Sequence, residues 1–224
     1  MPEQGGFCGG GDDVDFGNGA LIWRAAGEDG TRDLVGAGQK SGIFWALDPD
    51  TGEVVWDTWV GPAGPTGGIL KGSATDGERI YVAEGNSKQV RHFPQEHTLM
   101  SGQTIKYGSF AALDAATGEM IWQIPDPAGE TFPGNDTPCE VGSPREDCSG
   151  AFPKGPVTVA NGVVYACSTA PPGPMYAFDA SNGDLLWRFD SGARCDSGAA
   201  VIDGVVYWAG GRSPHAFTVP NSEN

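Results

Sequence analysis

The sequence predicts an all-β protein that forms part of a β-propeller. Three observations support this fold class. First, one segment occurs three times at a long, nearly constant spacing, and second, a weaker repeat lies between the copies. Third, the 224 residues include 36 Gly and 17 Pro, and the apolar residues do not recur with a helical period. Gly and Pro disfavour long helices, whereas sets of four short antiparallel strands with one large aromatic residue per set are typical of propeller blades. A β-sandwich would explain the turns but not the long repeat.

The stronger repeat predicts three equivalent hairpins. Residues 46–56 (ALDPDTGEVVW) return as 112–122 (ALDAATGEMIW) and as 177–187 (AFDASNGDLLW), 66 and 65 residues apart. In each copy two β-prone runs flank a turn in which Gly supplies a positive φ and Asp accepts hydrogen bonds from turn amides. We therefore expect the repeated Asp at the turns and the repeated Trp buried between adjacent sheets; these residues are Asp48, Asp114, Asp179, Trp56, Trp122 and Trp187.

The weaker repeat completes the predicted blades. Residues 72–82, 155–166 and 198–208 each run from Gly through small residues to an Asp-Gly or Asn-Gly turn and then to an apolar pair and Tyr. After a Gly-rich lead-in at 1–11, the predicted blades cover 12–60, 72–125, 155–190 and, incompletely, 197–224. Propellers close with four to eight blades, so these three to four blades predict a fragment of a longer ring.

Charge and hydropathy exclude several functions. The formal net charge of −16 and a pI near 4.3 argue against binding to nucleic acid or to an acidic membrane. No apolar run approaches the length of a transmembrane helix, and the polar residues after Met1 do not resemble a signal peptide.

The five cysteines predict at least one disulfide. Cys139 and Cys148 lie nine residues apart in a Pro-rich insert, and a disulfide between them would indicate an oxidising compartment. Pairing of Cys167 with Cys195 is a weaker alternative, and Cys8 has no evident partner. The chain contains no Cys-x-x-Cys-His haem attachment motif.

The strong repeat resembles the tryptophan-docking motif of pyrroloquinoline quinone (PQQ) propellers in all three copies, and the resemblance covers residues 12–210. Residues 13–17 (DVDFG), 35–42 (VGAGQKSG) and 67–74 (GGILKGSA) are similar to stretches of the polyvinyl-alcohol dehydrogenase branch. Relatives in that branch commonly place an aromatic residue where this chain has Lys71, which puts stacking contacts to the quinone or substrate in doubt.

The resemblance implies an eight-bladed quinoprotein of the periplasm or the extracellular space. Such an enzyme oxidises secondary alcohols with PQQ and Ca²⁺ and passes electrons to a cytochrome c. The motif also occurs in non-catalytic assembly lipoproteins, so a propeller that presents loops to a protein partner is the alternative. In either case we expect the isolated chain to be inactive, because half a ring does not enclose a cofactor on the channel axis.

Candidate site residues follow from the register of the repeats. The first strand of each blade lines the channel, and the residue before the repeated Gly at that strand is Lys71 in one blade and Lys154 in the next. Asp196 holds nearly the same place in the fourth blade and Asp15 in the first, and Lys40 lies in a tight turn. The lysines would bind the carboxylates of PQQ, and Asp196 or Asp15 would accept an alcohol proton. The alternative is that all five are solvated residues at strand starts and turns.

Metal ligands are not assigned from the sequence. His92 and His97 form a His-x₄-His pair in a long loop from Glu84 to Tyr107, which is weak evidence for zinc without a third ligand. Residues 134–137 (GNDT) offer oxygen atoms to Ca²⁺ but lack the alternating acidic pattern of a calcium loop.

Overall fold

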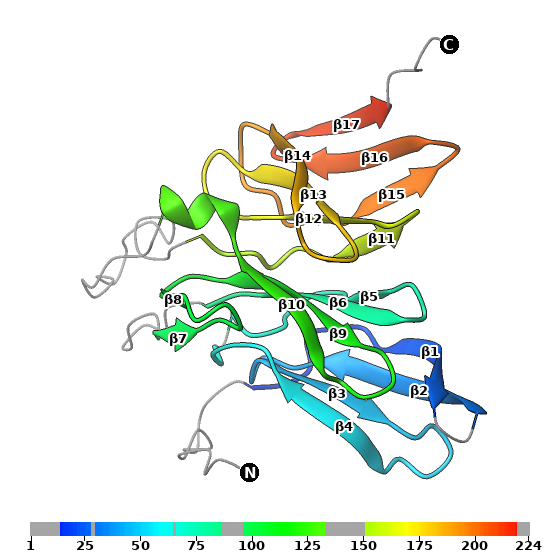
Figure 1. Ribbon diagram of the computed structural model, residues 1–224. Helices are drawn as coiled ribbons and strands as arrows, with labels where there is room; N and C mark the ends of the chain where they lie inside the picture. The colour runs from blue at the N-terminus through cyan, green and yellow to red at the C-terminus, as the bar shows by residue number, and fades with distance from the viewer. Residues whose placement is uncertain (1–13, 28–29, 65, 87–95, 133–150, 219–224) are drawn as a thin grey trace.

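The computed structural model describes residues 14–27, 30–64, 66–86, 96–132 and 151–218, and it consists of antiparallel sheets that follow one another along the chain (Figure 1). The first sheet has the order β1-β2-β3-β4, the second β10-β9-β6-β5, the third β11-β12-β13-β14, and the fourth, within the described residues, β15-β16-β17. The bounds are β1 Leu21–Gly27, β2 Gly30–Gly38, β3 Ile43–Leu47, β4 Val54–Trp59, β5 Ala74–Thr75, β6 Arg79–Glu84, β9 Ser109–Asp114, β10 Met120–Pro125, β11 Thr158–Ala160, β12 Val163–Cys167, β13 Pro174–Asp179, β14 Leu185–Asp190, β15 Ala199–Ile202, β16 Val205–Gly210 and β17 Ser213–Thr218. The prediction of an all-β fold with four-stranded propeller blades is confirmed.

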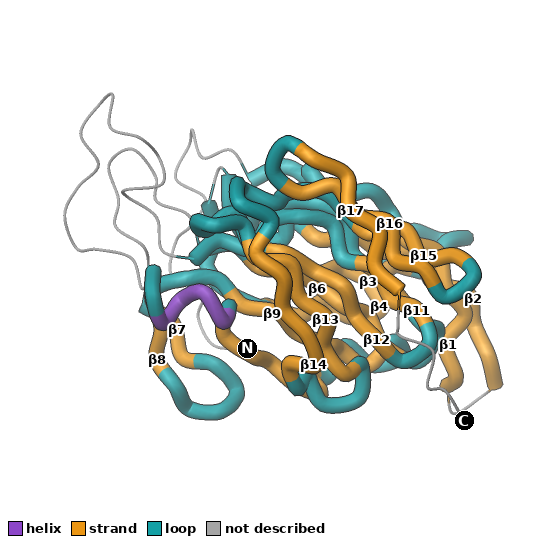
Figure 2. Tube along the Cα trace, turned by 90° about the horizontal axis from the view of Figure 1, so that it is seen from above, coloured by secondary structure: helices purple, strands orange, loops and turns teal. Residues whose placement is uncertain are grey.

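Two small elements lie outside the blades. The strands β7 (His97–Thr98) and β8 (Thr104–Ile105) form a hairpin, and Pro127–Glu130 form a short 3₁₀ turn, η1. Figure 2 shows both at one side of the stacked sheets. The hairpin occupies part of the segment from Glu84 to Tyr107 that the sequence predicted as a loop, so that prediction is wrong for these residues. In the described residues no helix is long and apolar enough to cross a membrane.

The repeated Asp closes each hairpin turn, as predicted. Asp48 Oδ1 accepts hydrogen bonds from the backbone amides of Asp50 and Thr51 at 3.0 and 2.8 Å. Asp114 Oδ1 accepts the equivalent bonds from Ala116 and Thr117 at 2.9 and 2.8 Å. In the third copy Asp179 Oδ1 accepts from the Ser181 amide at 2.8 Å. Hydrogen bonds to the ionised carboxylate lower the pKa of Asp48, chiefly through the Thr51 amide, and the pKa of Asp179, chiefly through the Ser181 hydroxyl and then the Ser181 amide.

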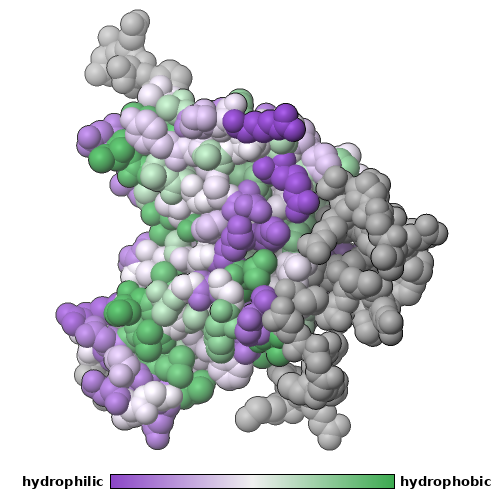
Figure 3. All heavy atoms as spheres, turned by 180° about the vertical axis from the view of Figure 1, so that it is seen from behind, coloured by the Kyte–Doolittle hydropathy of each residue, from purple (hydrophilic) through white to green (hydrophobic). Residues whose placement is uncertain are grey.

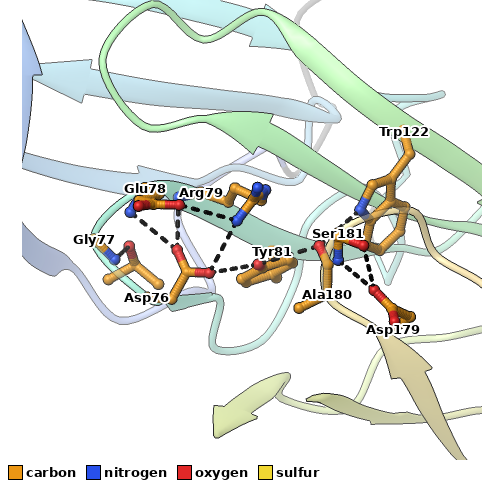
Figure 4. Close-up of polar contacts among 10 residues, drawn as sticks. Asp76, Gly77, Glu78, Arg79, Tyr81, Trp122, Asp179, Ala180 and Ser181 are labelled. Atoms are coloured by element: carbon orange, nitrogen blue, oxygen red, sulfur yellow. Dashed lines mark hydrogen bonds and ion pairs between the residues drawn. The ribbon is translucent and has the colours of Figure 1, made fainter. Parts of the chain in front are cut away.

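Two of the three repeated tryptophans are buried between sheets. The Trp122 side chain from the second sheet is 6% exposed, and its indole nitrogen donates to the carbonyl of Ala180 in the third sheet at 3.1 Å. The Tyr81 hydroxyl donates to the same carbonyl at 3.3 Å (Figure 4). A side chain at Gly183, in the turn after Ala180, would lie 2.9 Å from the Trp122 ring, so the turn needs Gly for this contact as well as for its φ of 80°.

The prediction fails for Trp187, which is 36% exposed. Trp56 packs on Gly118 of the second sheet and Trp122 on Gly183 of the third. Trp187 instead contacts Phe217 of β17, with ring centroids 4.8 Å apart, because the fourth sheet has no Asp-to-Gly turn after β17 in its described part. The repeated tryptophan is therefore buried only where the turn of the following blade packs on it.

Apolar clusters fill the spaces between successive sheets. Leu34, Phe44 and Trp56 of the first sheet pack with Ile80 and Leu113 of the second. Residues of the second sheet, among them Phe110, pack in the same way with Tyr176 and Phe178 of the third. The core is therefore divided into layers between blades, as in a repeat architecture.

Candidate functional site

The segments that lead into the first strands of successive sheets meet one another. Strand β5 contacts β1 and β11, and β11 contacts β15. The Val157 amide donates to the Gly72 carbonyl at 2.8 Å, and a side chain at either Gly72 or Gly198 would touch Pro156. These contacts place the first strands on the inner side of the stack, where the channel of a propeller lies.

Lys71, Lys154 and Asp196 converge at this inner edge. Lys71 Nζ lies 3.0 Å from Asp196 Oδ1 and 3.0 Å from the Asp196 backbone carbonyl, although 125 residues separate them in the chain. Lys154 Nζ lies 4.0 Å from Asp196 Oδ2. The geometric expectation that both lysines lean towards the same place, with Asp196 beside them, agrees with these distances.

The electrostatic setting keeps Asp196 ionised. Partial burial by itself raises the pKa of Asp196, but the hydrogen bond from Lys71 and the charges of Lys71, Lys154 and Arg194 together outweigh it, so the pKa lies below its usual range. The Lys154 side chain is only 17% exposed, and its ammonium group lies 5.7 Å from the centre of the Phe152 ring. A cation over an aromatic face in a partly desolvated place interacts more strongly with an anion than a surface lysine does.

A disulfide fixes the segment that carries Asp196. Cys167 at the end of β12 is bonded to Cys195, the residue before Asp196, with a Cα–Cα distance of 5.8 Å. Both cysteines are fully buried, and the Cys195 amide donates to the Ser168 carbonyl at 3.3 Å. The pairing that the sequence favoured less is thus the one the structure shows, while Cys139 and Cys148 lie outside the described residues.

Lys40 and Asp15 form a separate ion pair. Lys40 Nζ lies 2.7 Å from Asp15 Oδ1, and the Lys40 amide donates to the Asp15 carbonyl at 3.1 Å. The Lys40 side chain is 11% exposed, so it is not the solvated turn lysine of the alternative interpretation. A side chain at Gly17 would lie 2.8 Å from the Leu70 carbonyl, which places this segment directly against the strand lead-in that carries Lys71.

A buried carboxyl group that the sequence did not single out lies between the first and second sheets. Glu84 at the end of β6 is fully buried, and Ser109 Oγ donates to its Oε2 at 3.3 Å. His97 Nε2 lies 3.9 Å from the same oxygen. Burial raises the pKa of Glu84 well above its usual range, against the weaker opposing effect of the Ser109 hydrogen bonds. The sequence placed Glu84 at the start of a loop, and a terminal acidic residue after an apolar strand gives no signal of burial.

We expect Glu84→Gln to stabilise the protein increasingly as the pH rises. Because the pKa of Glu84 is raised in the folded protein, its contribution to the free energy of unfolding is fully present below the unfolded pKa. That contribution is lost as the pH rises through the folded pKa. Urea unfolding at about pH 5 and about pH 8 should therefore show a larger gain for the variant at the higher pH. Exposed Glu53 provides the matched control, Glu53→Gln. An equal effect of Glu84→Gln at both pH values would contradict the buried, protonated carboxyl.

The sequence-derived metal candidates are not brought together in the described part of the chain. His92 and residues 134–137 lie outside the described residues, and His97 lies beside Glu84. Among the residues that the structure describes, no group of three or more His, Cys, Asp or Glu side chains could hold a metal ion.

Comparison with known proteins decides the family. The PQQ_2 family model, described as outer membrane protein assembly factor BamB, matches residues 39–193, which is more than half of the chain. The chain belongs to the PQQ_2 family. It is 32% identical over 204 residues to a polyvinylalcohol dehydrogenase of a Pseudomonas species, a match that covers 89% of this chain and 27% of that protein. It is also 28% identical over 222 residues to the outer membrane protein assembly factor BamB of Burkholderia pseudomallei (strain K96243), covering 86% of this chain and 53% of the relative.

The structural similarity extends to a quinoprotein. The quinohemoprotein alcohol dehydrogenase of Comamonas testosteroni superposes with a TM-score of 0.57 at 14% identity, over 87% of this chain and 34% of that one. At this identity the superposition shows the fold alone. The PQQ_2 chain spans about a quarter of the length of the polyvinylalcohol dehydrogenase that it matches and about half of the BamB relative.

Proposed function

We propose that this PQQ_2 chain is part of a PQQ-dependent alcohol dehydrogenase that oxidises secondary alcohols of the polyvinyl-alcohol type and passes the electrons to a cytochrome c. The convergence of Lys71 and Lys154 on Asp196 at the inner edge of the sheets carries the proposal. The similarity to polyvinylalcohol dehydrogenase supports the proposed substrate class. The cytochrome partner and a periplasmic or extracellular location come from the family resemblance, and the buried Cys167–Cys195 disulfide is the kind of bond that persists in such compartments.

The residues present fit the anionic part of the cofactor. Two ammonium groups lie 3.0 and 4.0 Å from one carboxylate, so the site already holds a carboxylate between two lysines. A quinone with several carboxylates needs such a pair of cations. Ca²⁺ belongs to the proposal through the family resemblance, and its ligands are not assigned.

Each site residue has a proposed role. PQQ, when bound, supplies the two-electron acceptor. Lys71 and Lys154 bind its carboxylates and orient it, with Lys40 as a third cation held by Asp15. Asp196 is the proposed general base, because its carboxylate is ionised and lies beside both lysines at the inner edge of the sheets. Asp15 is the second candidate for this role.

Replacing either central lysine should weaken PQQ binding. In the full-length protein of which this chain is proposed to be part, titration calorimetry of PQQ with Ca²⁺ present should show a loss of about 1–3 kcal/mol, roughly five- to 150-fold in Kd, for Lys71→Ala and for Lys154→Ala. Lys106→Ala is the matched control, since Lys106 pairs with Glu96 at 3.5 Å on another part of the chain. If PQQ binding is unchanged in both variants, the two lysines do not bind the cofactor and are solvated residues at strand starts.

The second candidate function is a non-catalytic propeller that serves as a protein-binding scaffold. The similarity to BamB over about half of that protein's length favours it. The same titration separates the two: a scaffold binds no PQQ in the wild type, and the lysine variants then change nothing.

A further inference from the structure

The connections that lead into the first strands, and that carry the lysine–aspartate site, lie on one face of the molecule, here called the loop face. In each antiparallel sheet the ends of the second and fourth strands lie at this face as well. In the second sheet Ser109 at the start of β9 pairs with Glu84 at the end of β6 and with Pro125 at the end of β10. In the first sheet Ile43 at the start of β3 pairs with Trp59 at the end of β4. Trp59 therefore lies on the loop face.

The second sheet carries an additional hairpin on this face. Its second and third strands are joined by residues 85–108, whereas the corresponding connections are 39–42 in the first sheet and 168–173 in the third. The longer connection contains the hairpin of β7 and β8, which lies at one side of the stacked sheets (Figure 2). The rings of Trp59 and His97 of β7 contact each other in a T-shaped arrangement, with their centroids 6.4 Å apart. The hairpin and the end of β4 therefore form one surface.

Gln123 of β10 fixes the two parts of this surface to each other. Its side-chain nitrogen donates to the carbonyl of Val60, the residue after Trp59, at 2.8 Å. Its side-chain oxygen accepts a hydrogen bond from the amide of Met100, in the turn of the hairpin, at 3.1 Å. Gln123 itself is buried. The surface is therefore held in place before any ligand binds, which reduces the entropy that binding costs.

The exposed groups of this surface are apolar or uncharged. Trp59 is 47% exposed and Met100 is 60% exposed. Residues 98–105 contain no charged side chain, and they expose hydroxyl and amide groups around Met100. The hydroxyl oxygens of Thr98 and Thr104 lie 3.2 Å apart across the hairpin. A flat aromatic ring beside hydroxyl and amide groups suits a ligand that alternates apolar and hydroxyl groups.

Charge narrows the class of ligand. The chain has a formal net charge of −16, and Asp57 is exposed two residues before Trp59 on the same strand, so an anionic chain is repelled here. Hydrophilic residues are common on the surface and gather at mid-height when the molecule is seen from behind (Figure 3). The segment 98–105, by contrast, offers neither carboxylate nor ammonium groups to a charged chain. A neutral chain with many hydroxyl groups fits this surface best.

We propose that Trp59, Met100 and the exposed hydroxyl and amide groups of residues 98–104 form a subsite that binds an extended, neutral, polyhydroxylated chain. This inference rests on the proposed function, since the chain is the alcohol polymer whose hydroxyl groups are oxidised at the lysine–aspartate site. Trp59 lies on the fourth strand of its sheet and the site lies at the first strands, so three strand spacings separate them, roughly 15 Å. A small alcohol cannot span this separation, whereas an extended polymer contacts both places. The subsite therefore favours long substrates over short ones.

Binding of polyvinyl alcohol to the full-length protein of which this chain is proposed to be part, without PQQ, tests the subsite. Native electrophoresis in gels with increasing polymer gives the Kd from the retardation of the protein. We expect Trp59→Ala to raise this Kd about tenfold or more, and Trp59→Phe, which keeps an aromatic ring, to raise it much less. Thr104→Val removes one hydroxyl group and should raise the Kd about threefold or more. Val54→Ala is the matched control, since Val54 is 51% exposed at the opposite end of β4.

Four outcomes would overturn the subsite: no binding of polyvinyl alcohol by the wild type, equal binding by the wild type and Trp59→Ala, an equal loss in Val54→Ala, or equal retardation by polyethylene glycol, a neutral chain without hydroxyl groups along it. The first outcome would leave this surface as a contact for a polypeptide. Urea unfolding checks that Trp59→Ala is folded, and if it is not, Thr104→Val decides the test.

PQQ binding and alcohol oxidation by the wild type test the proposed function separately. An active enzyme whose polymer binding is unchanged in Trp59→Ala refutes the subsite alone. A protein that binds no PQQ but loses polymer binding in Trp59→Ala refutes the proposed function alone.

Discussion

Trp122→Ala is expected to lower the free energy of unfolding by about 3–5 kcal/mol, the cost of emptying a buried aromatic site. Trp122 is 6% exposed and packs on the Gly183 turn of the next sheet, where its indole nitrogen donates to the Ala180 carbonyl. The variant loses both the packing and the hydrogen bond, and it leaves the carbonyl with one donor fewer. Urea unfolding at a fixed protein concentration measures the loss, because association changes apparent stability.

Trp187→Ala is the matched control, because the same repeat position is 36% exposed there. Its cost should be about 1–2 kcal/mol. A second comparison separates docking from backbone strain: Gly183 and Gly52 have φ values of 80° and 73°, but a side chain at Gly52 meets nothing within 4 Å. Gly183→Ala should therefore destabilise more than Gly52→Ala. Equal costs within either pair would show that docking between blades contributes little.

The sequence predicted those features that depend on local chemistry repeated in register. The turn aspartates form the expected bonds because their partners lie two and three residues away. Lys71 and Lys154 meet Asp196 because equivalent strands of successive blades point to one axis. No long-range information was needed for either result beyond the repeat itself.

Features that depend on what packs on a residue were not predictable in the same way. Trp187 carries the full motif, yet its burial depends on the turn of the following blade. Glu84 ends an apolar strand like a surface residue, but Gly61 approaches so closely that a side chain there would lie 2.4 Å from the Glu84 carboxyl carbon. The Lys40–Asp15 contact likewise depends on a chain path that the turn sequence does not specify.

The contacts that hold Asp196 in place both stabilise the fold and position its carboxylate for the proposed reaction. Its neighbour Cys195 is anchored to β12 by the disulfide, and the two lysines reach it from the second and third sheets. The site is therefore assembled from three sheets, and a change that loosens one inner segment displaces the carboxylate from both lysines. Catalytic geometry is sensitive to displacements of about 1 Å. The proposed reaction would therefore require this segment to hold the Asp196 carboxylate rigidly, even though the side chain is partly exposed.

Removal of the Cys167–Cys195 disulfide should be the second large effect. The bond spans 28 residues, and in the chain-entropy model a loop of this length contributes about 3–4 kcal/mol to the free energy of unfolding. The double variant Cys167→Ser/Cys195→Ser should lose that amount in urea unfolding under oxidising conditions. Reductant should destabilise the wild type by a similar amount and should have a much smaller effect on the double variant, which controls for the remaining cysteines. If the double variant equals the oxidised wild type in stability, the disulfide does not constrain the unfolded chain, and the rigid placement of Asp196 must come from the packing of Gly155 and Pro156 against the same segment.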